Sequence, residues 1–421
     1  MTERMIIVTL LRAFIFLSTI FIIQFYFAKR LRNSLLQSGY FKDKRKLSIA
    51  IVSVILFFDL FPVFNTFASI YGVINPTTNF EIPKVFVIDY FFRIPSWMLI
   101  LIIVQVFLLS APIDLFFFAL KKINLKISNR LNFYISRYFF LLVIFFTGYI
   151  PLRIYYEFKN VVVEKRTYHI NSHNPELNNF RIAFISDIQA DRFTDAKRVT
   201  NYISKINELN PDIVLAGGDF LTGDSDYIPI IASLVKNIKS NYGVYSCIGD
   251  HDFFAFKRNY WRSIAEVKTA LEKNNVKMID DGNLILMINE SKIKITFLTN
   301  TYVKSYNEKI LDSLAQANQD AKLKILVTHQ PDEKIALKAN EYGYNLYLTG
   351  HTHGGQVNFL FPFLNITPVR LETKFISGDY WFGDLLMIVN RGLGMSTMPI
   401  RYHSIPEISL IEIKTESSAH N

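Results

Sequence analysis

Residues 344–356 read YNLYLTGHTHGGQ, an apolar run that stops at a glycine and continues into two histidines and two more glycines. The run has the length and composition of a buried β-strand. Gly350 allows the backbone to turn sharply after that strand. On such a tight loop, His351 and His353 can each present a ring nitrogen to a different metal ion. The segment therefore predicts a strand that delivers metal ligands from its carboxyl end.

Four other apolar runs end in polar residues of the same kind. They are followed by Asp187-Ile-Gln189, Gly217-Gly218-Asp219, Gly249-Asp250-His251-Asp252 and Thr328-His329-Gln330-Pro331. In α/β sheets, ligand groups gather in the crevice outside the carboxyl ends of the strands. One Asp at a strand end is usually a turn residue, but five ends that carry Asp, His and Gln indicate a shared site. Two divalent ions roughly 3.5–4 Å apart need a bridging carboxylate with imidazole and oxygen ligands on each side.

The strand-like runs alternate with segments of helical period, for example residues 196–209 and 263–274. Some runs are followed by a helical segment and others by a short turn. We therefore expect an α/β domain at residues 180–415, with layered, mixed β-sheets and flanking helices. Residues 156–179 are expected to be a polar connector, and residues 416–421 a polar tail.

The motifs D-x-x, G-G-D, G-x-H-D, T-H-x-P and G-H-T-H-G-G-Q resemble, in this order, those of the calcineurin-like metallophosphoesterase superfamily. The resemblance covers residues 180–413, and the segment at residues 391–408 is similar to the membrane-attached bacterial branch. It implies a first ion held by Asp187, Gln189, Asp219 and His353. It implies a second ion held by Asp219, Asp250, His329 and His351, so that Asp219 bridges the two.

The resemblance also implies a mechanism, the in-line attack of a metal-bound hydroxide on phosphorus. The hydroxide forms near neutral pH because the ions lower the pKa of bound water. His251 is the expected catalytic residue, which protonates the leaving oxygen or stabilises the transition-state charge. Asp252 either orients His251 or is an exposed turn carboxylate, and the sequence leaves both open.

Two positions depart from the family's usual pattern, which has His where this chain has Gln189 and Asn where it has Asp250. Both replacements supply oxygen donors, and Asp250 adds a third carboxylate. Such a site favours Mn²⁺, with Mg²⁺ or Fe²⁺ as other candidates, over softer ions that prefer nitrogen. A Gln at this position also resembles a manganese-dependent nucleotide-diphosphate branch of the superfamily. The alternative is that the two changes mark an inactive enzyme.

The first 150 residues carry most of the excess hydrophobicity of this 421-residue chain, of which half is hydrophobic. Four stretches there, residues 5–28, 47–74, 94–120 and 131–151, reach the roughly 20 residues needed to cross a bilayer. We expect a multi-span α-helical membrane domain at residues 1–155, with about four helices. The single cysteine, Cys247, excludes an intramolecular disulfide and a thiolate metal cluster.

The net charge of +10 is concentrated in two connections, residues 29–46 and 121–130, which flank the apolar stretches. Membrane topology explains this pattern better than nucleic-acid binding, and no nucleic-acid partner is expected. The positive-inside rule places both connections in the cytoplasm and the phosphoesterase domain on the extracytoplasmic side of a bacterial inner membrane. Inside the stretches lie four charges, which we expect to pair structurally as Arg12 with Asp59 and Asp114 with Arg137; the alternative is that they line a transport pathway.

These features predict a membrane-anchored, two-metal phosphoesterase that hydrolyses a phosphate ester or diphosphate. A lipid-borne phosphate suits a site tethered at a bilayer. One alternative is a cytoplasm-facing pyrophosphatase of a nucleotide-linked lipid precursor, and another is a catalytically inactive metal-binding membrane protein. Substrate identity and oligomeric state stay open.

Overall fold

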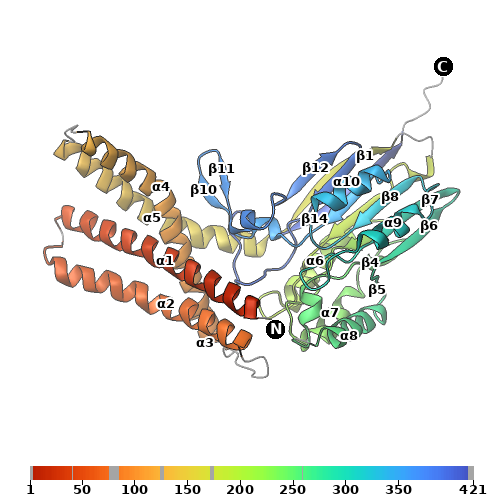
Figure 1. The fold of residues 1–421 in the computed structure, drawn as a ribbon, viewed down its shortest axis with the longest axis horizontal. Coiled ribbons are helices and arrows are strands. Elements are labelled where there is room, and N and C mark those ends of the chain that lie inside the picture. Colours follow the sequence, from red (N-terminus) through yellow and green to blue (C-terminus); the bar gives the residue numbers. More distant parts are fainter. Residues whose placement is uncertain are drawn as a thin grey trace, which may run out of the picture. The chain divides into compact units, whose positions relative to one another are not determined.

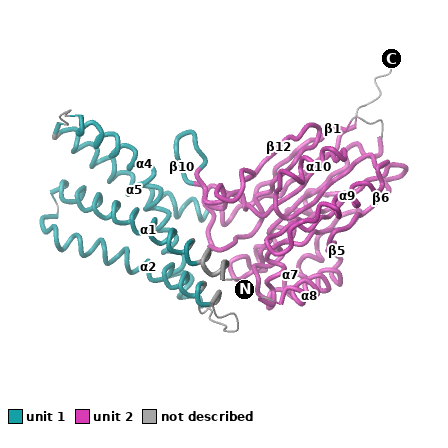
Figure 2. The backbone as a smooth tube through the Cα atoms, viewed as in Figure 1, with its two compact units in different colours: residues 1–156, 359–365 teal, residues 157–358, 366–421 magenta. Residues whose placement is uncertain are grey.

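A computed structural model describes residues 3–39, 41–74, 85–123, 128–170, 175–257 and 259–415. The side chain of Arg12 and the expected polar tail at residues 416–421 lie outside this description. The chain divides into two compact units (Figure 2), which we call the helical unit and the α/β unit. The helical unit comprises Met1–Tyr156 with Phe359–Asn365, and the α/β unit comprises Glu157–Asn358 with Ile366–Asn421.

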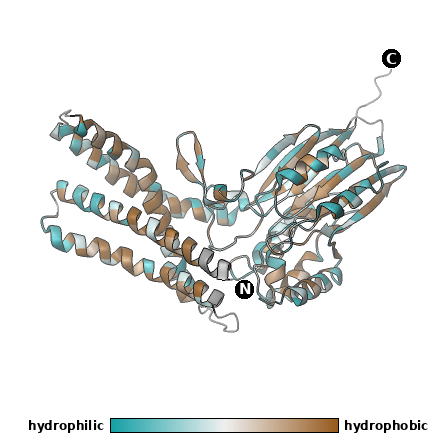
Figure 3. Ribbon diagram, viewed as in Figure 1, coloured by the Kyte–Doolittle hydropathy of each residue, from teal (hydrophilic) through white to brown (hydrophobic). Residues whose placement is uncertain are grey.

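The helical unit contains four long helices, which are apolar along most of their length (Figure 3). They are α1 (Glu3–Gln37), α2 (Lys44–Ile74), α4 (Ile94–Lys122) and α5 (Asn129–Lys159), with a short α3 (Phe86–Ile88) and a π-helical turn η1 (Asp89–Arg93) before α4. By length and composition, all four can cross a membrane, which confirms the expected number. Helix α1 continues past its apolar stretch, so Lys29 and Arg30 lie on a helix and not in a connection, as expected of good helix formers.

Only one of the two expected charge pairs can be checked, because the side chain of Arg12 lies outside the described residues. Asp114 on α4 lies 2.8 Å from Nε of Arg30 on α1, so the expected Asp114–Arg137 pair is wrong. Because α1 extends beyond its apolar stretch, Arg30 reaches this carboxylate. Asp59 accepts a hydrogen bond of 2.7 Å from Gln24, so α1 and α2 are also joined through a polar contact.

The α/β unit contains two six-stranded sheets (Figure 1). The first sheet has the order β1 (Val162–Ile170), β14 (Glu407–Thr415), β2 (Arg181–Ile185), β3 (Ile213–Ala216), β4 (Val244–Ser246), β5 (Val276–Met278). The second has the order β12 (Gly378–Phe382), β13 (Leu385–Val389), β9 (Leu346–Thr349), β8 (Leu323–Val327), β7 (Ser291–Phe297), β6 (Gly282–Ile288). Parallel and antiparallel neighbours occur in both sheets, so the expected mixed sheets are confirmed.

Strand β1 lies where the sequence suggested a polar connector. It pairs in parallel with β14 from Val162 to Ile170 and forms an edge of the first sheet. Its outward side chains are polar because an edge strand buries only one face, and this made the segment look like a linker.

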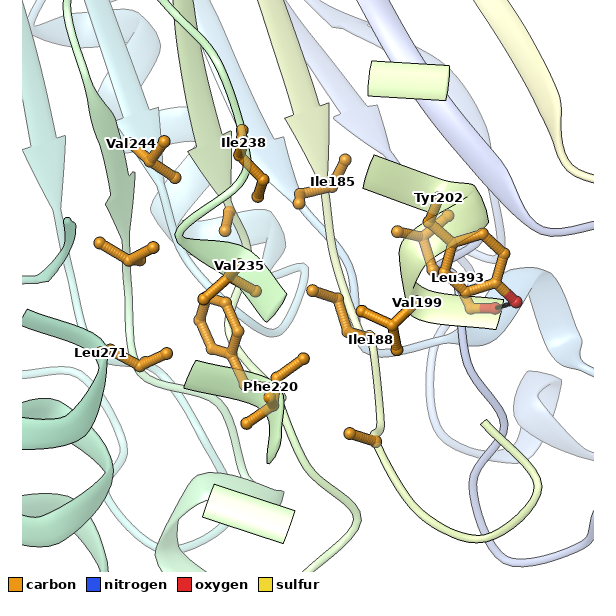
Figure 4. Close-up of a cluster of buried hydrophobic side chains, with 14 of the residues drawn as sticks. Ile185, Ile188, Val199, Tyr202, Phe220, Val235, Ile238, Val244, Leu271 and Leu393 are labelled. Atoms are coloured by element: carbon orange, nitrogen blue, oxygen red, sulfur yellow. Dashed lines mark hydrogen bonds between the residues drawn. The ribbon is translucent and has the colours of Figure 1, made fainter. Parts of the chain in front are cut away.

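The two sheets pack face to face, and helices cover their outer faces. Strand β2 illustrates the alternation, because Ile182 and Phe184 point into the cluster between the sheets while Ala183 and Ile185 belong to the cluster beneath the helices. Helices α6 (Ala196–Glu208), α7 (Tyr227–Val235) and α8 (Tyr260–Glu272) cover the first sheet (Figure 4), and α9 (Glu308–Gln316) and α10 (Glu333–Glu341) cover the second. The result is a layered α/β fold, with helices outside and two sheets inside.

A β-hairpin from the C-terminal half of the chain belongs to the helical unit. It consists of β10 (Phe359–Phe361) and β11 (Leu364–Ile366). The side chain of Gln105, buried on α4, accepts from the backbone N–H of Leu360 at 2.8 Å and donates to its carbonyl at 2.7 Å. Helix α4 thus supplies hydrogen-bond partners for both the N–H and the carbonyl group of Leu360 in the hairpin.

Candidate metal centre

The expected ligands come together at the carboxyl ends of five strands. Strands β2, β3 and β4 run parallel in the first sheet, and β8 and β9 run parallel in the second. Candidate ligand atoms of Asp250, His329 and His351 all lie within 4.8 Å of one another, and so do those of Asp187, Asp219 and His329. His329, which belongs to both groups, links the two sheets at the site.

The remaining two candidates adjoin these groups. Gln189 donates from Nε2 to Oδ2 of Asp219 at 2.7 Å. His353 places Nε2 3.6 Å from Oδ1 of Asp187. All seven side chains named from the sequence therefore lie around one centre.

The backbone of the site is strained. Five of the seven candidate ligands have a positive φ, which non-glycine residues rarely adopt; they are Asp187 (52°), Gln189 (50°), Asp219 (59°), His351 (69°) and His353 (49°). Each such residue costs about 1–3 kcal/mol, and such strain clusters at ligand clamps and active sites. The rest of the fold maintains these conformations, which indicates a functional site.

Glycine makes the close approach of the loops possible. A Cβ atom on Gly249 would overlap Oδ1 of Asp219, and one on Gly350 would overlap the side chains of Ser186 and Asp187. Any other residue at these two positions would push the loops apart. The glycines therefore set the spacing of the carboxylates.

The charges at the site favour a bound cation. Burial alone would lower the pKa of His329, but Asp219 and Asp250 outweigh it and raise that pKa. Burial likewise opposes protonation of His351, yet hydrogen bonds to Asp250 and Glu372 raise its pKa to about 9. Burial raises the pKa of Asp219 to about 7, although His329 opposes the shift. The negative charge of the site thus keeps protons on His329, His351 and Asp219. A bound metal ion would displace these protons and balance the same negative charge.

The hydrogen bonding of three buried atoms shows whether the site suits a metal ion. Oδ1 of Asp187 and Oε1 of Gln189 are buried and have no hydrogen-bond partner in the described part of the chain. Buried oxygens of this kind are costly unless something binds them. Nδ1 of His329 lies 2.7 Å from the carbonyl of Gly217 and donates to it, so when a cation takes the place of the second proton, Nε2 is the nitrogen that offers its lone pair. The residues present therefore fit divalent cations.

Sequence reasoning missed two residues that hold the histidines. Glu372 places Oε1 2.8 Å from Nε2 of His351, which directs Nδ1 toward Asp250 at 2.9 Å. Arg401, which is buried, places Nη2 3.2 Å from Nδ1 of His353. Arg401 lies in the segment that resembles the bacterial branch, whereas nothing local marked Glu372.

The half-buried His251 is held by groups other than Asp252. Its Nδ1 lies 2.7 Å from the carbonyl of Thr222, and its Nε2 lies 3.1 Å from Oγ of Ser396. Burial lowers the pKa of His251. The orientation of this imidazole is therefore fixed by a backbone carbonyl and a hydroxyl.

Asp252 is neither an exposed turn residue nor the group that orients His251. Its carboxylate is buried and accepts hydrogen bonds of 3.0 Å from the backbone N–H groups of Asp219, Phe220 and Gly249. Both suggestions made from the sequence are thus wrong, because neither anticipated that the loops after β3 and β4 converge on this side chain. Asp252 braces the two loops that carry Asp219 and Asp250.

Comparisons with known proteins agree with this geometry. The sequence profile of the family described as calcineurin-like phosphoesterase matches residues 180–355. An uncharacterized metallophosphoesterase of Bacillus subtilis, YkuE, is 29% identical over 240 residues, covering 56% of this chain and 79% of that protein. The phosphodiesterase YaeI of Escherichia coli is 23% identical over 240 residues, covering 56% and 82%. A Bos taurus "transmembrane protein with metallophosphoesterase domain" is 25% identical over 245 residues, covering 56% and 53%.

The fold and the site define a metal-dependent phosphoric ester hydrolase with long apolar helices before its catalytic domain. Residues 180–355 of the chain match the calcineurin-like phosphoesterase family, and the similar proteins are named metallophosphoesterases or phosphodiesterases.

Proposed function

We propose that this protein is a membrane-anchored phosphoesterase that uses two divalent ions. The observation that carries the proposal is the pair of buried, unpartnered oxygens on Asp187 and Gln189, within a cluster of carboxylates and imidazoles. One ion would be held by Asp187, Gln189, Asp219 and His353. The other would be held by Asp219, Asp250, His329 and His351.

Bound ions would supply activation of water and neutralisation of phosphate charge. The protein's own residues do the positioning. His329 keeps its Nδ1 proton on Gly217, so that Nε2 stays directed at the carboxylates. His251 follows Asp250 directly, and its Nε2, beside Oγ of Ser396, is the ring nitrogen that would act on the leaving oxygen, by protonating it or by stabilising the transition-state charge. The test is His251→Ala, which should abolish hydrolysis while the metal content of the purified protein stays unchanged.

We propose Mn²⁺ as the preferred ion. Gln189 and the three carboxylates make the donor set rich in oxygen, which suits Mn²⁺, Mg²⁺ or Fe²⁺ better than softer ions. Activity of protein stripped of metal and reloaded with one ion at a time tests this choice. Equal or better activity with Zn²⁺ would contradict it.

We propose a lipid-borne phosphate or diphosphate as the substrate. Support comes from the hairpin at residues 359–366, which begins six residues after His353 and hydrogen-bonds with Gln105 on α4. A loop that carries a metal ligand is thus continuous with a segment of the helical unit. Kinetics on phosphorylated lipids in vesicles and on soluble nucleotides separate the possibilities. A clear preference for soluble substrates would contradict this proposal.

We propose that the α/β unit faces the extracytoplasmic side, because the basic residues near the ends of α1 and α4 mark the opposite side as cytoplasmic. A reporter that is active only outside the cytoplasm, fused after Asn421, should be active. Activity of a cytoplasm-only reporter would instead favour a pyrophosphatase of a nucleotide-linked lipid precursor.

A further inference from the structure

The helical unit contains a cavity of about 770 Å³ between α1, α4 and α5. It lies far along the sequence from the metal ligands, and none of its lining residues takes part in the site described above. Its lining includes Lys29, Arg30, Asp114, Phe118, Lys121 and Phe133. The lining combines cations with aromatic and aliphatic side chains.

Three cations contribute to this cavity against one carboxylate. Asp114 binds Nε of Arg30 at 2.8 Å and accepts a hydrogen bond of 2.7 Å from Tyr26, which fixes the guanidinium in place. The Nη groups of Arg30 make no hydrogen bond to the described residues. Among those same residues, Lys29 and Lys121, which both line the cavity, make no ion pair. The cavity therefore presents a fixed guanidinium fork and two ammonium groups to an anion.

The apolar part of the lining continues onto the surface of the helices. Phe118 is 56% exposed and Leu115, one turn away on α4, is 68% exposed. Lys121 lies in the last turn of α4 and Arg30 lies near the end of α1, so the cations are at the end of two apolar helices. Lipid phosphates lie at the ends of membrane-spanning helices, and basic pockets between such helices bind phosphate headgroups.

We propose that this cavity binds the phosphate headgroup of an anionic phospholipid. The guanidinium of Arg30 and the ammonium groups of Lys29 and Lys121 bind the phosphate oxygens. The acyl chains lie along the exposed aromatic surface of α4 and α5. The cavity shares no residue with the metal centre, so the bound lipid is structural and its occupancy does not depend on hydrolysis.

The experiment measures lipid binding to the full chain in detergent by native mass spectrometry. The probes are phosphatidylglycerol and phosphatidylcholine, which differ in net charge. The wild type should retain phosphatidylglycerol in preference. The double variant Lys29→Gln/Lys121→Gln should retain it at least about tenfold less well, since each basic residue near a charged membrane surface contributes about fivefold.

A matched control removes the same charge elsewhere. Lys44→Gln/Lys46→Gln changes two lysines at the start of α2, which do not line the cavity, and should retain phosphatidylglycerol like the wild type. Equal loss in both double variants, or no loss in either, would overturn the proposal.

Two further measurements show whether the variants are folded and whether the cavity binds a lipid or only free anions. Both double variants should hydrolyse a soluble aryl phosphate at the wild-type rate, which reports on the intact α/β unit. If inorganic phosphate at millimolar concentration displaces the bound phosphatidylglycerol, the cavity binds small anions and not a lipid, and the proposal is wrong. A soluble-substrate rate that is unchanged while lipid retention falls supports it.

Discussion

Oε1 of Glu372 lies 2.8 Å from Nε2 of His351, although 21 residues separate them in the chain and Glu372 lies outside every motif. A carboxylate in this position holds the imidazole in one orientation and makes the other ring nitrogen a better metal ligand. Glu372 is therefore a positioning residue for the metal centre. Its side chain is 41% exposed, so a substitution by a smaller residue leaves no buried cavity.

Glu372→Ala should weaken Mn²⁺ binding by about 10–100-fold, the usual effect of losing such a partner. Isothermal titration calorimetry on metal-stripped protein measures it, and excess Mn²⁺ should restore activity. Glu372→Gln, which keeps an oxygen acceptor for Nε2, should bind nearly as well as the wild type. The control Glu333→Ala removes an exposed partner of Lys374 and should bind Mn²⁺ normally. Unchanged affinity in Glu372→Ala would refute the role.

Asp252→Asn should destabilise the α/β unit by about 2–4 kcal/mol. The two carboxylate oxygens accept hydrogen bonds from three backbone N–H groups. An amide has only one oxygen, so it cannot accept all three bonds, and the substitution leaves a buried donor unpaired. Thermal unfolding followed by circular dichroism measures the change. Asp226→Asn, in a residue that makes no side-chain cap at the start of α7, is the control. A melting temperature within a degree or two of the wild type would show that the brace is unimportant.

Gln189→His should move the metal preference toward softer ions. The wild-type side chain offers one buried amide oxygen and donates from Nε2 to Asp219. An imidazole would offer nitrogen in place of that oxygen, and nitrogen ligands suit Zn²⁺. The ratio of activity with Zn²⁺ to activity with Mn²⁺, measured on reloaded protein, should rise. If the ratio falls or stays constant, Gln189 does not control the choice of metal.

Gln105→Leu should reduce activity on vesicle-borne substrate while leaving activity on a soluble aryl phosphate unchanged. The change removes both hydrogen bonds to Leu360 and leaves the two backbone groups of the hairpin unpaired. A parallel loss on both substrates would mean that the hairpin supports the metal loop itself. No loss on either would remove the support that the hairpin gives to a lipid substrate.

Lys294→Met should flatten the dependence of stability on pH in the alkaline range. Burial and the nearby Lys324 lower the pKa of Lys294 to about 8, from 10.5 in the unfolded chain. Between these values the unfolded state binds more protons, so the wild type gains stability as pH rises. The melting temperature of metal-free protein at about pH 7.5 and about pH 10 measures the gain. The variant lacks this titration, and an equal gain in both proteins would contradict the assignment.

The candidate ligands of the proposed metal centre could be named from the sequence alone. Each ligand follows an apolar run directly, and apolar runs become buried strands because of local hydrophobic pattern. Parallel strands then place their carboxyl ends at one edge of a sheet, so Asp187, Asp219 and Asp250 had to meet. The four apolar helices followed in the same way from length and composition.

Only the tertiary structure decided what surrounds those ligands. Ser396 reaches His251 across 145 residues, and Glu372 reaches His351 across 21. Such contacts depend on where loops lie in space, and no periodic pattern in the sequence records that.

The same reason explains why Arg30 and not Arg137 pairs with Asp114, and why Asp252 braces two loops. Local pattern determines which residues form strands and helices. Long-range packing determines which polar groups then come within hydrogen-bond distance, because many loops and helix faces are compatible with one pattern.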